Sequence, residues 1–181
     1  HRFYNKHHLV PFGEYLPLRE ILYRLLRLFN IPVSNFSSGK GTEKNFETDK
    51  GNFGMSICYE DAYGNEIRSS MPEANILINV SNDAWFGDSI APHQHLQIAR
   101  MRAIENSRYF LRATNNGVSA IIDNRGNVIS RSPQFEKHVL NSNVMLFSGA
   151  TPFSKYGNMP LFIFFALFIF IYILKRKFLK K

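Results

Sequence analysis

Apolar and polar residues alternate along this chain with two different periods, which separates the expected helices from the expected strands. In 18–29 and in 92–110 the apolar residues recur every three or four positions, as on one face of a helix. Short apolar runs at 53–59 and 75–80 predict two buried strands, each followed by polar residues. Helices that alternate with buried strands in this way predict an α/β fold built around one sheet.

The second half of the chain changes to short apolar runs separated by turn residues, which is typical of antiparallel strands. Strands are expected at 109–114, 118–123, 128–132 and around 138–146. The turn sequence NRGN at 124–127 predicts a hairpin. By contrast, the patterns predict an extended segment and loop at 1–17, an exposed loop at 34–52 and a helical segment at 60–72.

A long apolar run near the C-terminus predicts a membrane-spanning helix. No charged residue occurs from Tyr156 to Leu174, and this stretch would rise roughly 28 Å as a helix, about one bilayer core. The basic sequence KRKFLKK follows it, and such flanks favour the cytoplasmic side, so the C-terminus is expected inside and the preceding domain outside. A buried core helix is the alternative. The basic amphipathic helix at 18–29 either packs on the sheet or lies in the membrane interface.

Composition and charge narrow the class of protein. The chain has 181 residues, 45% of them hydrophobic and 20% charged, which indicates a folded domain. The formal net charge is +8, and five basic residues follow position 174, so the excess belongs to the membrane flank and not to a nucleic-acid surface. Since the first residue is His1 and the chain begins within a dense motif, we expect the sequence to be part of a longer protein.

The chemistry centres on Cys58, the only cysteine. A lone cysteine is often a small buried apolar residue. Here, however, an apolar strand runs directly into Cys58 and a helical segment follows, which is where many α/β enzymes place a nucleophile. A thiol attacks as the thiolate and needs a base or a nearby cation. Lys6 is the candidate cation, and Glu14 and Glu60 are candidate carboxylates, although spacing alone gives a weak signal.

Several segments together carry a more specific signal than any of these residues alone. They are YNKHHLVPFGEYLP at 4–17, ICYED at 57–61, VSNDAWFGDS at 80–89, HQHLQIARMRAIENSRYFLRATNNGVSAIID at 93–123 and TPFSKYGNMP at 151–160. In these segments the chain resembles the nitrilase superfamily and, within it, the apolipoprotein N-acyltransferases of bacterial inner membranes. The resemblance runs over almost the whole chain and extends to the final apolar run.

The resemblance implies a nitrilase-like α-β-β-α sandwich, present here in part, with a Glu–Lys–Cys triad. Cys58 matches the nucleophile, and Lys6 matches the lysine that stabilises the thiolate and the oxyanion. Glu14 matches a carboxylate that positions Lys6 or assists proton transfer. The backbone N–H of Tyr59 would be the second oxyanion donor, and Glu60 would shape the pocket. For Glu14 and Glu60 the alternative is an ordinary salt bridge to a lysine or arginine. No residue here matches the general-base glutamate, which the family carries upstream, so we expect this chain alone to be inactive.

Other residues are expected at the rim of the pocket. Asn82, Trp85 and Phe86 follow the second buried strand, and Trp85 either contacts an acyl chain or packs as an interfacial aromatic. His93 and His95 lack a third ligand at suitable spacing, so no metal is expected. A Cys–His protease arrangement leaves Lys6 in its motif unexplained.

The resemblance therefore implies three parts: a catalytic portion at 1–155, a transmembrane helix at 156–174 and a basic cytoplasmic tail at 175–181. The implied reaction moves a fatty acyl chain from a phospholipid, through a Cys58 thioester, to the N-terminal amine of an apolipoprotein, without any cofactor. We expect a monomer in the inner membrane, completed by an N-terminal membrane half, with its catalytic domain on the periplasmic side. The alternatives are a membrane-anchored amidase of the nitrilase type and a non-catalytic remnant that binds lipid or a partner.

Overall fold

The computed structural model describes residues 3–17, 36–40 and 45–178, and within them the chain forms one six-stranded mixed sheet. The strands are β1 (Asn45–Thr48), β2 (Gly51–Ile57), β3 (Ile76–Ser81), β4 (Phe110–Thr114), β5 (Ala120–Ile122) and β6 (Val128–Arg131), and they lie in that order across the sheet. The three central strands β2, β3 and β4 are parallel, and the outer pairs are antiparallel. Parallel neighbours joined by helices confirm the predicted α/β class. The expected helix at 18–29 lies outside the described residues.

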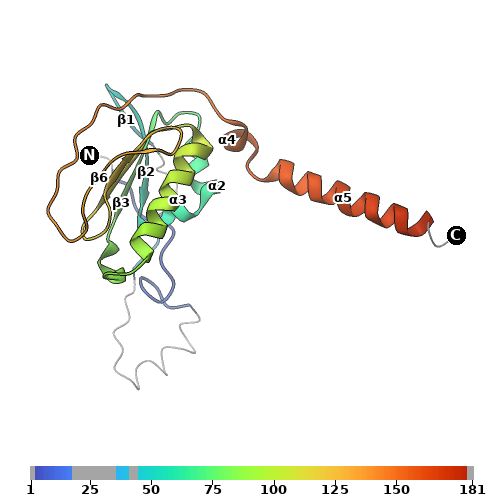
Figure 1. The fold of residues 1–181 in the computed structure, drawn as a ribbon, viewed down its shortest axis with the longest axis horizontal. Coiled ribbons are helices and arrows are strands. Elements are labelled where there is room, and N and C mark those ends of the chain that lie inside the picture. Colours follow the sequence, from blue (N-terminus) through green and yellow to red (C-terminus); the bar gives the residue numbers. More distant parts are fainter. Residues whose placement is uncertain (1–2, 18–35, 41–44, 179–181) are drawn as a thin grey trace, which may run out of the picture.

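Helices connect the parallel strands and cover one face of the sheet. They are η1 (Cys58–Ala62), α2 (Gly64–Arg68), η2 (Asp83–Phe86) and α3 (Ala91–Asn106), whereas α4 (Pro152–Tyr156) and α5 (Met159–Phe178) follow the last strand. Figure 1 shows α2 and α3 side by side against the sheet, with α4 near their ends and α5 projecting away from the rest of the molecule. The described part thus supplies one sheet and one layer of helices.

The sheet face beneath α3 holds the main core. Leu77 of β3 and Phe110 of β4 point to this face and are 2% and 0% exposed, because strand side chains alternate between the two faces. Ala99 and Ala103 of α3 meet them, and both are fully buried. Small residues on the inner face of the helix let α3 approach the sheet closely. The helix predicted at 92–110 is present as α3 at Ala91–Asn106.

The opposite face of the sheet is covered without a helix. Ile76 and Tyr109 lie there, and Leu140, Val144 and Phe147 from the chain after β6 pack against them. The predicted strand around 138–146 is wrong, since this segment forms no ladder with the sheet. Its apolar residues cover the face with side chains, and the backbone N–H of Phe147 donates to the carbonyl of Asn75 (3.2 Å).

A strand also replaces part of the loop expected at 34–52. β1 pairs with β2 in an antiparallel hairpin that turns at Asp49 and Lys50. The sequence NFET of β1 is mostly polar because the strand lies at the edge of the sheet and is half exposed. Because β1 lacks the alternation of apolar and polar residues that marks a half-buried strand, the sequence pattern predicts a loop there.

The apolar C-terminal run forms α5, shifted from the predicted range of 156–174. Tyr156 belongs to α4, and Gly157 with φ of 56° separates the two helices. Among the described residues, Met159–Lys177 is the one helix long and apolar enough to cross a membrane by length and composition, and none of it is buried.

Candidate active site

Cys58 lies at the carboxyl end of β2, as the first residue of η1. Its backbone has φ of 54°, in the left-handed region that few residues other than glycine adopt. The side chain of Asn79 on the neighbouring strand donates from Nδ2 to the Cys58 carbonyl (3.1 Å) and to the Ser56 hydroxyl (2.9 Å). The strand-to-helix turn is thus held by a neighbour, and strain of this kind is typical of a nucleophile turn.

Glu60 connects this turn to the N-terminal segment of the chain. The side chain is fully buried, and its Oε2 accepts from the Ile57 N–H (2.7 Å) and from the Tyr4 hydroxyl (2.9 Å). Its Oε1 accepts from the backbone N–H groups of His7 (2.7 Å) and His8 (3.2 Å). One carboxylate therefore fixes the backbone on both sides of the site, which is more than the pocket-shaping role expected from the sequence.

Lys6 comes just before the two N–H groups that Glu60 binds. Its ammonium group lies 2.7 Å from both carboxylate oxygens of Glu14. The Lys6 and Glu14 side chains are only 11% and 21% exposed, and Glu14 Oε2 also accepts from the Val10 N–H (2.8 Å). The structure thus brings Lys6 and Glu14 together, and a charge-assisted pair of this kind orients the lysine. Its catalytic role stays a prediction.

Exposed aromatic side chains lie at the same end of the sheet. Trp85 and Phe86 of η2 are 65% and 44% exposed. A Cβ atom at Gly13 would lie 3.9 Å from the Trp85 ring, so the indole lies over the loop that carries Glu14. Asn82 caps η2, since its Oδ1 accepts from the Ala84 N–H (3.2 Å). The structure gives Asn82 a structural contact, and its predicted contact with substrate stays untested.

Tyr59 follows Cys58 and is 40% exposed. Its ring meets that of Tyr63 edge to face at 5.2 Å, and Tyr63 stacks on His8 at 4.1 Å. These contacts orient η1 relative to the N-terminal segment. The role of the Tyr59 backbone N–H as an oxyanion donor stays a prediction.

A buried network of charged side chains lies under the nucleophile turn, and sequence reasoning missed it. Arg112 of β4 donates to Asp83 (2.8 Å) and to Asn79 (3.3 Å), and its NH1 lies 3.4 Å from Asp61 of η1. His95 of α3 contacts Asp61 through Nε2 (2.8 Å) and Arg112 through Nδ1 (2.7 Å). Asn79 and Arg112 stand inside otherwise apolar strands, and these interruptions were the signal in the sequence.

The network shifts the acid–base equilibria of its members. Burial disfavours ionised Asp83, but hydrogen bonds from His95 and Ser81 and the charge of Arg112 outweigh it and lower the pKa of Asp83 to about 2. Burial and the Arg112 charge oppose protonation of His95, yet Asp61 and Asp83 raise its pKa above the usual value. Ion pairing rather than solvent therefore sets the charge of this layer beneath Cys58.

Comparison with known proteins identifies the family. The sequence profile described as carbon-nitrogen hydrolase matches residues 2–146. The chain belongs to the carbon-nitrogen hydrolase family. The crystal structure of Saccharomyces cerevisiae Nit3, from the nitrilase superfamily, is 23% identical with a TM-score of 0.50, covering 57% of this chain and 41% of that one. This likeness confirms the nitrilase-like fold.

Curated relatives of this carbon-nitrogen hydrolase are named apolipoprotein N-acyltransferase. The protein of Nitrosomonas europaea is 47% identical over 166 residues, which is 92% of this chain and 33% of the relative. That of Haemophilus influenzae is 46% identical over 170 residues, 93% of this chain and 33% of the relative. The chain thus spans about one third of the length of these relatives.

The carbon-nitrogen hydrolase chain has one group of side chains that could hold a metal ion, within the described residues. His7, His8 and Glu66 place their donor atoms within 4.8 Å of one another, and the imidazoles pair with the Glu66 carboxylate. The pair His93 and His95, which the sequence analysis rejected as ligands, diverges: His93 is exposed, and His95 is buried beside the Arg112 guanidinium. A cation next to a guanidinium is unfavourable.

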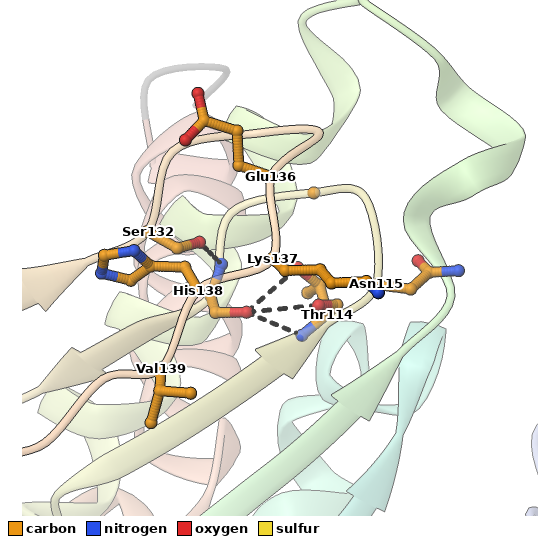
Figure 2. A pocket seen from close by; sticks show the side chains of 9 residues that line it. Thr114, Asn115, Ser132, Glu136, Lys137, His138 and Val139 are labelled. Carbon is orange, nitrogen blue, oxygen red and sulfur yellow. Dashed lines mark hydrogen bonds between the residues drawn. The ribbon is translucent and has the colours of Figure 1, made fainter.

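A polar pocket of about 300 Å³ lies farther along the sheet edge, between the end of β4 and the chain after β6. Its lining residues are Thr114, Asn115, Gly117, Ser119, Ser132, Glu136, Lys137, His138 and Val139. Hydroxyl groups of its floor bind backbone N–H groups: Ser119 Oγ accepts from the Thr114 N–H (3.0 Å), and Ser132 Oγ accepts from the Ser119 N–H (3.0 Å). Figure 2 marks hydrogen bonds among the lining residues with dashed lines. These bonds brace the β4–β5 turn of the carbon-nitrogen hydrolase fold.

Proposed function

We propose that this chain is the catalytic part of an apolipoprotein N-acyltransferase. The observation that carries the proposal is the identity of 46–47% over nine-tenths of the chain to proteins of that name. The site agrees with it, because a strained cysteine turn and an ion-paired lysine are linked through one buried glutamate. A thiol nucleophile that is assisted by a fixed cation suits acyl transfer.

In the first half-reaction the Cys58 thiolate attacks the ester carbonyl of a phospholipid. The C–S bond forms, the ester C–O bond breaks, and the alkoxide leaves as a lysophospholipid after it takes a proton. The Lys6 ammonium and the Tyr59 N–H stabilise the oxyanion. Glu14 holds Lys6 in place through both carboxylate oxygens. A general base takes the proton of the Cys58 thiol and gives it to the departing alkoxide.

In the second half-reaction the N-terminal amine of a lipid-modified apolipoprotein attacks the thioester. The C–N bond forms, the C–S bond breaks, the general base takes a proton from the amine, and Cys58 returns as the thiolate, so the product is an amide. Trp85 and Phe86 are the proposed contacts for an acyl chain, since both rings are exposed and Trp85 lies beside the loop that carries Glu14. Neither step requires a metal or an organic cofactor.

The enzyme works in the bacterial inner membrane, with α5 as a spanning helix and the catalytic part on the periplasmic side. The support is the length and apolar composition of α5 and the basic residues in its last turn. It acts as a monomer together with an N-terminal membrane half. An anchored amidase is the second candidate, favoured by the description of the family as carbon-nitrogen hydrolase. It differs only in the acceptor, which is water.

Intact-mass spectrometry of the full-length protein after incubation with phospholipid vesicles tests the proposal. The expected result is a fatty-acyl mass increment that hydroxylamine removes and that Cys58→Ser abolishes. Addition of a lipid-modified peptide should then discharge the increment as peptide amide. Discharge to free fatty acid at the same rate with and without peptide would favour the amidase. A parent protein that stays unmodified on accessible vesicles would overturn the phospholipid donor.

A further inference from the structure

The joint between the catalytic part and α5 is locked by two arginines that bind backbone carbonyl groups. Figure 1 shows α4 as a short helix between the globular part and the projecting α5. A joint of this kind decides whether the two parts move independently or as one body. The contacts of the 149–157 segment therefore bear on how the nucleophile is presented to a membrane.

Arg108 makes the first lock. Its side chain is only 2% exposed, and no carboxylate lies within ion-pair distance of it in the part of the chain that the structure describes. Instead, Nε donates to the Ala74 carbonyl (2.6 Å) and NH2 to the Gly149 carbonyl (2.6 Å). Ala74 precedes β3 in the core, and Gly149 begins the joint. A buried guanidinium whose donors serve carbonyl groups ties these two backbone segments together.

Arg68 makes the second lock from the last turn of α2. Its NH1 donates to the carbonyl groups of Ser154 (3.1 Å) and Lys155 (3.4 Å) in α4. A Cβ atom at Gly157 would lie 3.0 Å from Arg68 Nε, so the backbone that leads into α5 packs directly on the guanidinium. The residue that ends α4 is therefore in contact with α2.

Thr151 completes the joint at the start of α4. Its hydroxyl donates to the Glu105 carbonyl of α3 (2.5 Å) and accepts from the Ser154 N–H (3.0 Å), which caps the helix. The short helix is thus bound to both α2 and α3. Hydrogen bonds at Gly149, Thr151, Ser154 and Lys155 therefore hold the segment that leads into α5 against the domain.

We propose that Arg68 and Arg108 are positioning residues for the membrane reaction, because they lock the 149–157 joint and thereby set the height and tilt of Cys58 over the bilayer. The inference rests on the proposed acyl transfer from a phospholipid. An ester carbonyl at the membrane interface is reached only from a narrow range of heights, whereas an ester dissolved in water is reached from any. Loosening the joint should therefore slow acyl transfer from the phospholipid ester and leave acyl transfer from the dissolved ester unchanged.

The test uses the full-length protein in vesicles, as parent and as Arg68→Ala. Loading of Cys58 is followed by intact mass with vesicle phospholipid and, separately, with the soluble ester p-nitrophenyl butyrate. We expect Arg68→Ala to slow loading from phospholipid about tenfold, which corresponds to roughly 1.4 kcal/mol of barrier, and to leave loading from the soluble ester within about twofold. Arg68→Lys keeps the positive charge but loses the forked guanidinium donors. Its rate of loading from phospholipid should lie between those of the parent and Arg68→Ala.

Hydrogen exchange gives a readout that does not depend on activity. The amides of 151–157 should exchange at least about tenfold faster in Arg68→Ala, whereas those of α3 should not change. Arg100→Ala is the matched control, because Arg100 Nε also donates to a backbone carbonyl, that of Gly126 (2.7 Å), away from the joint. This variant should match the parent in both assays.

The outcomes separate the two proposals. A parent that takes no acyl group from phospholipid overturns the proposed function and the positioning role with it. If the parent is loaded, and Arg68→Ala slows loading from both esters equally or slows neither, the positioning role alone is overturned. Unchanged exchange at 151–157 in Arg68→Ala also overturns it.

Discussion

The carboxylate of Glu60 receives four hydrogen bonds, and each donor comes from a part of the chain that the site must hold. Tyr4 is the one side-chain donor among them. Burial and the Glu60 charge raise the pKa of Tyr4, so its hydroxyl stays protonated and donates. We expect Tyr4→Phe to cost about 1 kcal/mol of positioning, and hence about a fivefold slower acylation of Cys58. Single-turnover loading measures this effect.

The control for this variant is Tyr172→Phe, since Tyr172 is 61% exposed and lies in α5, beyond the 149–157 joint. It should load at the parental rate. If Tyr4→Phe also loads at that rate, the Tyr4–Glu60 bond does not help to place Lys6 near the nucleophile.

The network under the nucleophile predicts how stability depends on pH. His95 has its pKa raised in the fold, so the stability it contributes is full below about pH 6.5 and is lost as pH rises through the folded value. Asp83 has its pKa lowered to about 2, so its contribution is present above its ordinary value and is lost as pH falls toward 2. Between these limits the four charges are paired.

We therefore expect the free energy of unfolding to decline above about pH 6.5 and the His95→Gln variant to lose most of this slope. Denaturant unfolding at several pH values measures it, and His93→Gln, at an exposed position, should keep the parental slope. An equal slope in the parent and in His95→Gln would contradict the assignment.

The sequence motifs single out some of the site residues but do not predict most of their contacts. Lys6, Glu14 and Cys58 stand in dense motifs, and the structure brings Lys6 and Glu14 into contact. The bonds of Glu60 and the pairing of Arg112 with Asp83 could not be predicted, because they join segments far apart in the chain. A pattern shows that a polar residue interrupts a buried strand, but partners across the sheet depend on register and packing.

At the scale of elements, the turn between β4 and β5 depends on Gly117. A Cβ atom there would lie 2.2 Å from Asp83 Oδ2, whose carboxylate is buried and bonded to Arg112. Gly117→Ala must push this carboxylate aside, and we expect a loss of about 2–3 kcal/mol of stability from the disturbed ion pair. Thermal or denaturant unfolding measures it.

Gly13 provides the matched comparison. An added Cβ there would meet its nearest atoms at 3.5 Å, an ordinary van der Waals distance, so Gly13→Ala should cost less than about 1 kcal/mol. Equal losses in the two variants would mean that contact with Asp83 does not explain the need for Gly117.

The elements themselves were predicted best where a period is strong. The range 92–110 predicts α3 to within a few residues, because its apolar face packs on the sheet. β1 and the segment 138–146 were misjudged for opposite reasons: β1 is polar because it lies at an edge, and 138–146 is apolar because it covers a face. Local pattern reports burial, and burial does not distinguish a paired strand from a covering loop.

For the whole molecule, the direction of α5 is the property that gives the site its environment. The last turn of α5 carries Lys175, Arg176 and Lys177, and its first turn carries no acidic residue. A charged residue at the centre of a bilayer costs about 2.5–3.5 kcal/mol, so the proposed spanning helix predicts this basic end at a membrane surface, on the cytoplasmic side.

We therefore expect a reporter that fluoresces only in the cytoplasm to be active when fused after Lys181 of the full-length protein. The same reporter fused after Gly149, with α4 and α5 removed, should be dark, because that end lies on the other face of the membrane. Activity of the Gly149 fusion with silence of the Lys181 fusion would invert the orientation and place Cys58 in the cytoplasm. Equal activity of both would show that α5 does not span. Either result would contradict the proposal that Cys58 reacts with a phospholipid in the outer leaflet of the inner membrane.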